Sequence, residues 1–170
     1  APGHYRSVFV VRADDARQTL GEFDGARFAF NEPLSQSGWA APQTHAAKLG
    51  LQLPPAVQTG AHRLSAQAVA EGRADIAALD AVTFSLMQDA DPVHARLRVV
   101  GMTDPTPGLP LITASDQDPG PIFAAVADAI AALPADDRVS LRLKGIVQVP
   151  VADYLAVPNP PAPEQIAGSD

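Results

Sequence analysis

The sequence predicts an α/β fold in which helices flank a mainly parallel sheet. Short β-branched or apolar runs alternate with amphipathic segments of helical length along most of the chain. The run 75–79 is apolar through its centre, as is typical of a strand that is covered on both faces. The 12 glycines and 17 prolines are interleaved with these segments, so they indicate the boundaries of many short elements.

Strands are expected where β-branched, aromatic or apolar residues form short runs. Residues 5–12 are such a run, and Asp24-Gly25 is a turn that leads into the next one. Residues 139–143 are ambiguous, and 145–149 are either a strand or an extended segment. The expected strands are 5–12, 26–30, 56–59, 75–79, 97–102 and 109–113.

Helices are expected where apolar residues recur at every third or fourth position. In the segment 14–23 this edge consists of Leu20 and Phe23, and in 121–133 a longer apolar stripe follows a proline near the first turn. Gly50 ends the second helix. The expected helices are 14–23, 39–49, 62–71, 81–88 and 121–133.

The composition excludes several classes of function. The net charge is −7, from 12 basic and 19 acidic residues, which disfavours nucleic acids and anionic lipids because these partners need a basic face. A small anion remains compatible, since a few aimed N–H groups bind one in an acidic protein. The absence of cysteine excludes thiol catalysis, disulfides and thiolate metal sites. No apolar run reaches the roughly 18 residues of a membrane-spanning helix, and the first residues do not resemble a signal peptide.

Polar residues gather in the loop 31–39, between an expected strand and an expected helix. Its centre, Ser35-Gln36-Ser37-Gly38, can present hydroxyl and backbone N–H donors to an oxyanion at the positive end of the helix dipole. The same residues are also ordinary helix caps, because serine is a preferred N-cap residue. From the pattern alone, capping and anion binding both remain open.

Two further strand ends carry residues of the right kind. His62 follows Thr59-Gly60-Ala61 at the start of a helix, where its ring can donate to an anion, although a single histidine there is also an ordinary surface residue. Asp80 follows the run 75–79 and either caps the next helix or accepts a hydrogen bond from a protonated ligand oxygen. Ligands of α/β sheets bind beyond the carboxyl ends of strands, so these loops are the candidate binding region.

Catalytic and metal-binding alternatives have weaker support. The sequence contains no G-x-S-x-G, so its loop serines with His62 and Asp80 are only a set of triad residue types. The four histidines lack metal-ligand spacing, and the chain has no H-E-x-x-H, no G-x-G-x-x-G and no P-loop. We therefore expect no catalytic residue, no metal site and no cofactor.

Five motifs stand in order along the chain. The N-x-x-x-S-x-S-G-aromatic pattern at 31–39 is preceded by the strand 5–12 and followed by a small-Gly-small-His turn at 59–62. The others are the segment 68–83 and the strand and turn at 97–100 and 107–110. Together, from about Tyr5 to about Val149, they resemble the phosphate-, phosphite- and phosphonate-binding proteins of ABC importers, a branch of the type 2 periplasmic binding proteins. In that family the corresponding segments are a crossover strand, the anion-binding loops and the return to the first lobe.

The resemblance implies a set of ligand contacts. Aminophosphonate binders of the family hold the ligand's ammonium with acids at the positions of Val82 and Leu109, so an amino-bearing phosphonate is disfavoured here. A carboxylate at Asp80 would favour a monoprotonated phosphate-like species over sulfate. The implied ligand-binding residues are Ser35, Gln36, Ser37, His62 and Asp80. Further candidates for ligand contact are Asn31, Gly38, Trp39 and Thr83.

The resemblance also implies a function and partners. It implies a non-enzymatic solute receptor that closes two lobes on a small oxyanion, by a hinge near Val10–Val11 and Val99–Met102, and delivers the ligand to an ABC permease. It further implies a periplasmic monomer without nucleic-acid partner, with a cytoplasmic location left open. The alternatives are an enzyme on the same two-lobe fold, acting on a small anionic metabolite, and the effector-sensing domain of a transcription regulator.

The same resemblance divides the chain into four parts. Residues 1–11 are expected to be the crossover strand from the first lobe, and 12–100 the second α/β lobe. Residues 101–157 are expected to return to the first lobe, and 158–170 to form a proline-rich tail that is extended or disordered. Family members begin with a first lobe before the crossover strand, so we expect the first lobe to be incomplete in this sequence.

Overall fold

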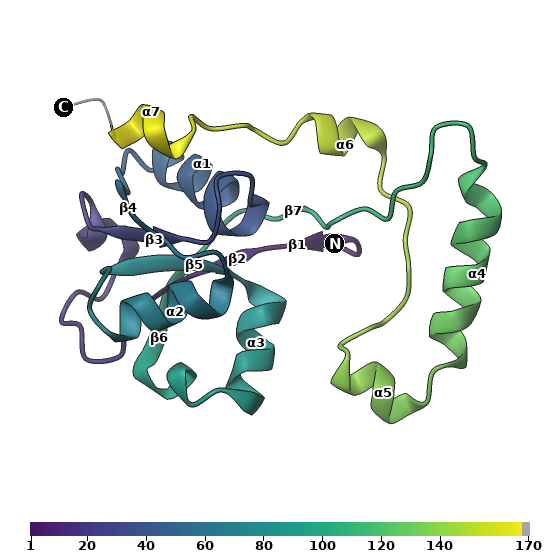
Figure 1. Cartoon of the computed structure of the whole chain (residues 1–170), viewed down its shortest axis with the longest axis horizontal. Coiled ribbons are helices and arrows are strands. Elements are labelled where there is room, and N and C mark those ends of the chain that lie inside the picture. The colour runs from purple at the N-terminus through teal and green to yellow at the C-terminus, as the bar shows by residue number, and fades with distance from the viewer. Residues whose placement is uncertain (168–170) are drawn as a thin grey trace. The chain divides into compact units, whose positions relative to one another are not determined.

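Five strands form a mixed sheet in the order β4 (Pro55–Gln58), β3 (Phe28–Phe30), β5 (Ile76–Asp80), β2 (Ser7–Arg12) and β6 (Leu97–Met102) (Figure 1). The computed structural model describes residues 1–167. β3 is parallel to both β4 and β5, whereas β2 is antiparallel to both β5 and β6. Every strand except β2 therefore points the same way, which confirms the prediction of a mainly parallel sheet.

Helices cover both faces of this sheet (Figure 1). α1 (Ala41–Lys48) lies on one face, and α2 (His62–Ala70) and α3 (Ala81–Ala90) lie on the other. Val8 and Val10 of β2 belong to the core cluster that contains α2 and α3 side chains. The alternate residues Phe9 and Val11 belong to the second cluster, which contains Trp39. Because both faces are covered, the β5 residues before Asp80 are all buried, as their apolar character predicts.

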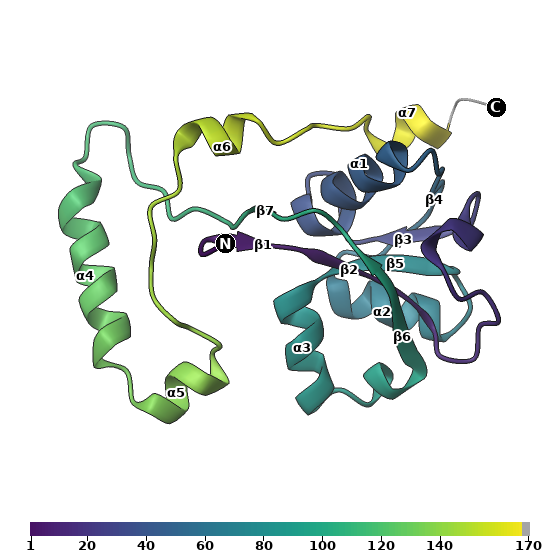
Figure 2. The ribbon, with the colours of Figure 1, turned by 180° about the vertical axis from the view of Figure 1, so that it is seen from behind.

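The chain divides into two compact units. The first, which we call the sheet unit, holds Tyr5–Thr106 and the chain from Val157 onward, and it contains the five-stranded sheet. The second, the helical unit, holds Ala1–His4 and Pro107–Ala156. β1 (His4–Tyr5) and β7 (Thr106–Pro107), which include the boundary positions, pair with each other as a two-stranded sheet. The chain enters the sheet unit along β1, leaves it along β7 and returns to it at Val157, a course that can be followed in Figure 2.

The helical unit contains α4 (Pro119–Ala132), α5 (Ala135–Ser140) and α6 (Val151–Leu155). None of the residues in these helices is buried. Hydrogen bonds between distant residues join its segments: the Tyr154 hydroxyl donates to the Gly108 carbonyl (3.0 Å), and the Gly108 N–H donates to the Gly3 carbonyl (2.7 Å). Nowhere within residues 1–167 is a helix both long and apolar enough to cross a membrane.

Two predicted elements are wrong. The helix predicted at 14–23 is reduced to the 3₁₀ turn Leu20–Phe23, because Thr19 and Glu22 form a capping box that starts the helical turn at Leu20. The strand predicted at 109–113 does not form, and its residues are exposed and outside both sheets. This apolar run predicts a strand, but no other strand pairs with it.

Other boundaries differ in detail. A π-helix, Gln36–Ala40, precedes α1, so the second helix begins earlier than predicted and shortens the predicted loop. A 3₁₀ turn, Pro92–Arg96, follows α3, and it was not predicted. The tail 158–170 contains a short helix, α7 (Pro163–Ala167), and its last three residues lie outside the described range.

Candidate functional site

The predicted ligand-binding loops lie at one edge of the sheet unit. β3 leads into the π-helix, β4 into α2 and β5 into α3. These three strands are parallel neighbours, so their carboxyl ends lie along the same edge, which we call the carboxyl edge. The first turns of three helices, with the positive ends of their dipoles, therefore face one region.

Ser35 starts the π-helix as its N-cap. Its Oγ accepts a hydrogen bond from the Gly38 N–H (3.0 Å), and its carbonyl accepts from the N–H groups of both Trp39 and Ala40 (3.0 Å each). The second of these carbonyl bonds is of the i→i+5 kind that defines a π-helix, a form frequent at functional sites. The capping alternative is therefore confirmed for the Ser35 side chain, whose own O–H remains a donor.

The turn after Ser35 is shaped by close packing. A Cβ on Gly38 would lie only 1.8 Å from Asn31 Oδ1, so this position requires glycine. Asn31 Oδ1 is buried and has no hydrogen-bond partner among the described residues, while the Asn31 carbonyl accepts from the Gly60 N–H (2.8 Å). The backbone N–H groups of Gln36 and Ser37 lie in the first helical turn, where the helix itself offers no acceptor.

A hydrogen bond joins Ser37 to His62, with Ser37 Oγ 2.9 Å from His62 Nε2. Burial lowers the pKa of His62 below its ordinary value of 6.5, and the nearby charge of Asp80 opposes that effect. The ring is therefore neutral at pH 7, and its buried Nδ1 has no partner within the described residues. Whichever atom donates in the contact, one polar hydrogen of the pair remains for a ligand: the Ser37 O–H or the Nδ1–H.

The structure adds Tyr5, which the sequence reasoning missed. The half-buried Tyr5 side chain lies close enough to Ser37, Thr106 and Asp80 for these residues to act on its pKa. Burial is the main cause that raises the pKa of Tyr5 above 10.0, so its hydroxyl keeps its proton and can donate. Because β2 is antiparallel to β5, Ser7 pairs with Asp80, and the preceding Tyr5 reaches the carboxyl edge. Only this long-range register identifies Tyr5, since no local pattern does.

Asp80 is the N-cap of α3. Its Oδ1 accepts a hydrogen bond from the Thr83 N–H (2.7 Å), so the capping alternative is confirmed, and Thr83 contributes its backbone to the cap. A carboxylate has more acceptor positions than this one bond uses. Asp80 is also close enough to shift the pKa values of Tyr5 and His62. It therefore remains an acceptor beside the donors of the carboxyl edge.

Trp39 lies in the core and not at the carboxyl edge. Its side chain is 1% exposed and packs against Phe28 and Phe30, with ring centroids 6.3 and 4.9 Å away. The indole Nε1–H donates to the Pro161 carbonyl (3.2 Å). Because both its face and its N–H are occupied by the protein, this ring offers no surface for stacking a ligand.

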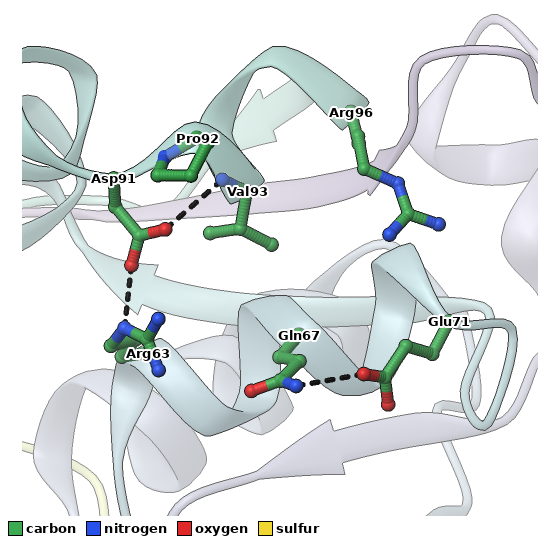
Figure 3. Close-up of a pocket in the computed structure, with 7 residues that line it drawn as sticks. All are labelled: Arg63, Gln67, Glu71, Asp91, Pro92, Val93 and Arg96. Atoms are coloured by element: carbon green, nitrogen blue, oxygen red, sulfur yellow. Dashed lines mark hydrogen bonds and ion pairs between the residues drawn. The ribbon is translucent and has the colours of Figure 1, made fainter.

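A groove of about 280 Å³ lies elsewhere in the sheet unit, between α2 and the 3₁₀ turn Pro92–Arg96 (Figure 3). Its charged groups pair with protein partners: Arg63 Nε is 2.5 Å from Asp91 Oδ2, and Gln67 donates to Glu71 (2.7 Å). No predicted ligand residue lines it. Within residues 1–167, no three His, Asp or Glu side chains are grouped so that they could hold a metal ion.

The sequence matches one family model across most of its length. The model is described as "ABC transporter, phosphonate, periplasmic substrate-binding protein", and it matches residues 2–154. A search among curated proteins finds no significant match.

Solved structures with the same fold include three bacterial proteins. XAC2383 from Xanthomonas citri, in a structure bound to ATP, is 17% identical, with a TM-score of 0.68 over 96% of this chain and 65% of that one. A binding protein component of an ABC phosphonate transporter from Pseudomonas aeruginosa is 21% identical, with a TM-score of 0.65 over 84% of this chain and 50% of that one. PhnD1 from Prochlorococcus marinus, in complex with methylphosphonate, is 20% identical, with a TM-score of 0.57 over 62% of this chain and 43% of that one. The chain thus spans less than two thirds of the length of each.

Proposed function

Because this chain belongs to the family of phosphonate-binding periplasmic substrate-binding proteins of ABC transporters, we propose that it captures a small phosphorus oxyanion at the carboxyl edge. The observation that carries the proposal is the gathering of neutral donors there. The Ser37–His62 pair and the Tyr5 hydroxyl stand at the edge where α2 begins without a side-chain cap. In a chain of net charge −7, such aimed donors are what can hold an anion.

The proposed contacts use the donors that the fold leaves unpaired. The phosphoryl oxygens accept from the hydroxyls, from the imidazole and from the backbone N–H groups of the first helical turns. Three other candidates act indirectly: Asn31 and Gly38 shape the turn, and Thr83 completes the Asp80 cap. The proposed ligand-binding residues are Tyr5, Ser35, Gln36, Ser37, His62 and Asp80.

Asp80 selects the protonation state of the ligand in this proposal. A ligand oxygen that carries a proton donates to the Asp80 carboxylate, whereas a fully ionised oxyanion meets only repulsion there. Phosphate, phosphite and phosphonates hold a proton near neutral pH, and sulfate does not. A site that offers the ligand an acceptor disfavours an anion that lacks the matching donor, so sulfate should bind more weakly.

The substituent on phosphorus is small or apolar in this proposal. Val82, 45% exposed in the first turn of α3, supplies no carboxylate for a ligand ammonium. An ammonium bound there would lose its hydration without gaining an ion pair. Methylphosphonate, the ligand in the PhnD1 complex, fits these requirements and is therefore the probe of choice.

We assign the sheet unit to one lobe of a two-lobe receptor and the helical unit to the return toward the other lobe. The expected hinge at Val10–Val11 and Val99–Met102 falls within β2 and β6, which pair with each other in the sheet, so we place it instead at Tyr5 and Thr106, where the chain passes between the units. The proposed receptor is a periplasmic monomer that releases its ligand to an ABC permease.

The enzyme alternative has one feature in its favour and one against. The Ser37–His62 distance of 2.9 Å suits a nucleophile and its base. A working pair also needs a third group that orients the base. His62 Nδ1 has no partner among residues 1–167, and Asp80, the nearby acid, caps α3 instead. A binding site therefore explains the arrangement better than a hydrolytic one.

Thermal unfolding and calorimetry with a panel of anions test the proposal. We expect methylphosphonate, phosphite and phosphate to bind and raise the Tm, and sulfate and 2-aminoethylphosphonate to bind far more weakly. Ser37→Ala should weaken methylphosphonate binding by about tenfold or more, the worth of one buried hydrogen bond. The matched control is Ser140→Ala, at an exposed serine of α5, which should leave affinity unchanged. The proposal fails if no anion of the panel binds, or if Ser37→Ala binds as well as the parent chain.

A further inference from the structure

Ser7, the first residue of β2, makes a buried polar contact with the ligand-binding turn. Its side chain is enclosed, since the residue is 1% exposed, and its hydroxyl donates to the Ser37 carbonyl (2.8 Å). The two residues come from different elements and are 30 positions apart in sequence. Burying a hydroxyl costs free energy unless it is hydrogen-bonded, so this contact has a definite direction and partner.

The Ser37 carbonyl needs that donor because the helix does not supply one. At the junction of the π-helix and α1, the Ala41 N–H donates to the Gln36 carbonyl. The next residue, Pro42, has no N–H to offer. The Ser37 carbonyl therefore accepts a hydrogen bond from neither of these two helical residues. The Ser7 hydroxyl of β2 donates to it instead.

Ser7 is also joined to the segment that leaves the sheet unit. Its N–H donates to Thr103 Oγ1 (3.0 Å), and the Thr103 N–H donates back to the Ser7 carbonyl (3.0 Å). Thr103, 2% exposed, directly follows β6 and lies three residues before Thr106. Arg6 adds a further bond from its guanidinium to the Thr103 carbonyl (2.8 Å).

We propose that Ser7 is the positioning residue of the anion site: it fixes the Ser37 turn to Thr103, so that the ligand-binding turn and the exit of the chain from the sheet unit move as one body. The inference rests on the proposed function for its effect on ligand affinity. Its structural part, the rigidity that Ser7 gives to the turn, does not require a ligand.

Amide hydrogen exchange of the ligand-free chain tests that structural part. Ser7→Ala should speed exchange at Gly38, Trp39 and Ala40 by about tenfold, the worth of one buried hydrogen bond, and Ser7→Thr, which keeps the hydroxyl, should restore it. The matched control is Gln43→Ala, which removes another buried side-chain bond of α1, from Gln43 Nε2 to the Leu53 carbonyl (2.9 Å). It should leave these three amides unchanged. Equal exchange in Ser7→Ala and the parent chain, or an equal effect of Gln43→Ala, overturns the proposal.

A second variant tests the same contact in case Ser7→Ala does not fold, and the affinity for methylphosphonate gives a second readout. Thr103→Val keeps the shape of the side chain and removes the oxygen that holds Ser7, so it should loosen the same amides. Methylphosphonate should bind about tenfold more weakly to both Ser7→Ala and Thr103→Val. If the parent chain binds no anion, the proposed function fails, while the exchange data still decide the role of Ser7. If the parent chain binds and both variants bind equally well, the positioning role is refuted.

Discussion

Two opposing effects act on the pKa of His62 at the carboxyl edge. Burial disfavours its charged form and lowers its pKa, whereas the charge of Asp80 favours it. An anion held at Ser37 would add a second negative charge beside the ring. The bound state should therefore hold a proton on His62 that the free state lacks at neutral pH, so that anion binding and proton uptake are coupled.

The pH dependence of affinity tests this coupling. The free protein holds the pKa of His62 below 6.5, and bound anion raises it, so the affinity for methylphosphonate should increase as the pH falls from 8 toward 6. The ligand itself also titrates in this range, so the quantity to measure is the ratio of affinities of the parent chain and His62→Gln. Calorimetry should give a ratio that rises as the pH falls. A ratio that stays constant over this range contradicts the assignment.

The lowered pKa of His62 also makes the stability of the ligand-free fold depend on pH. Without ligand, the neutral ring stabilises the fold at pH values above 6.5, and that contribution is lost as the pH falls through the lowered pKa of His62. Saturating methylphosphonate should recover part of this loss. Denaturant unfolding at a series of pH values checks this: His62→Gln, which does not titrate, should show neither the loss nor its recovery.

At the scale of elements, the π-helix is the feature that builds the site. Ser35 caps it, its first N–H groups have no acceptor within the helix, and its Ser37 Oγ lies 2.9 Å from His62 Nε2. The turn is compact enough that Gly38 lies against the Asn31 side chain. Packing at this one glycine thus controls where the donors lie.

Gly38→Ala should disrupt the π-helix. The new Cβ would meet Asn31 Oδ1 at 1.8 Å, so the Asn31 side chain or the turn must shift. We expect a loss of about 1–3 kcal/mol in the free energy of unfolding, as for overpacked cores, together with weaker methylphosphonate binding. The matched control is Gly21→Ala in the Leu20–Phe23 turn, where an added Cβ meets nothing within 4 Å. Denaturant unfolding measures the free energy of unfolding of the two variants. Equal values for both would show that the close approach of residue 38 to Asn31 does not control stability.

The sequence predicts elements well where local pattern and packing agree. β3, α2 and β5 lie close to their predicted positions because hydrophobic period and burial point the same way. The segment 14–23 fails because its apolar pair serves a single 3₁₀ turn, started by the Thr19 cap. The π-helix has no signature of its own in the sequence, since a serine and a glycine before an apolar run predict an ordinary helix start.

The residues of the candidate site also differ in whether local sequence pattern predicts them. Ser37 and His62 could be anticipated because each follows a strand and precedes a helix, and parallel strands share an edge. Tyr5 could not, because it reaches the site through the antiparallel pairing of β2 with β5, in which Ser7 lies opposite the sequence-distant Asp80. The inward position of Trp39 also depends on tertiary packing, against Phe28 and Phe30.

Over the whole molecule, the net charge disfavours anions, whereas the groups at the carboxyl edge favour them. The chain carries a net charge of −7, so its overall field repels anions. In the ligand-free state the carboxyl edge offers neutral hydroxyls, a neutral imidazole and helix dipoles, which act only over short distances. In the proposed function, such a site accepts one small oxyanion and discriminates against polyanions, as a receptor for a phosphonate requires.

A chemical-shift titration of the 170-residue chain with methylphosphonate tests the central claim most directly, because it detects and locates even weak binding. We expect saturable shifts at the backbone amides of Gln36 and Ser37 and at the ring of His62, with little change at the groove residues Gln67 and Arg96. Sulfate at the same concentration should cause much smaller shifts. The absence of any saturable shift at the carboxyl edge, or shifts confined to the groove of Figure 3, would contradict the claim.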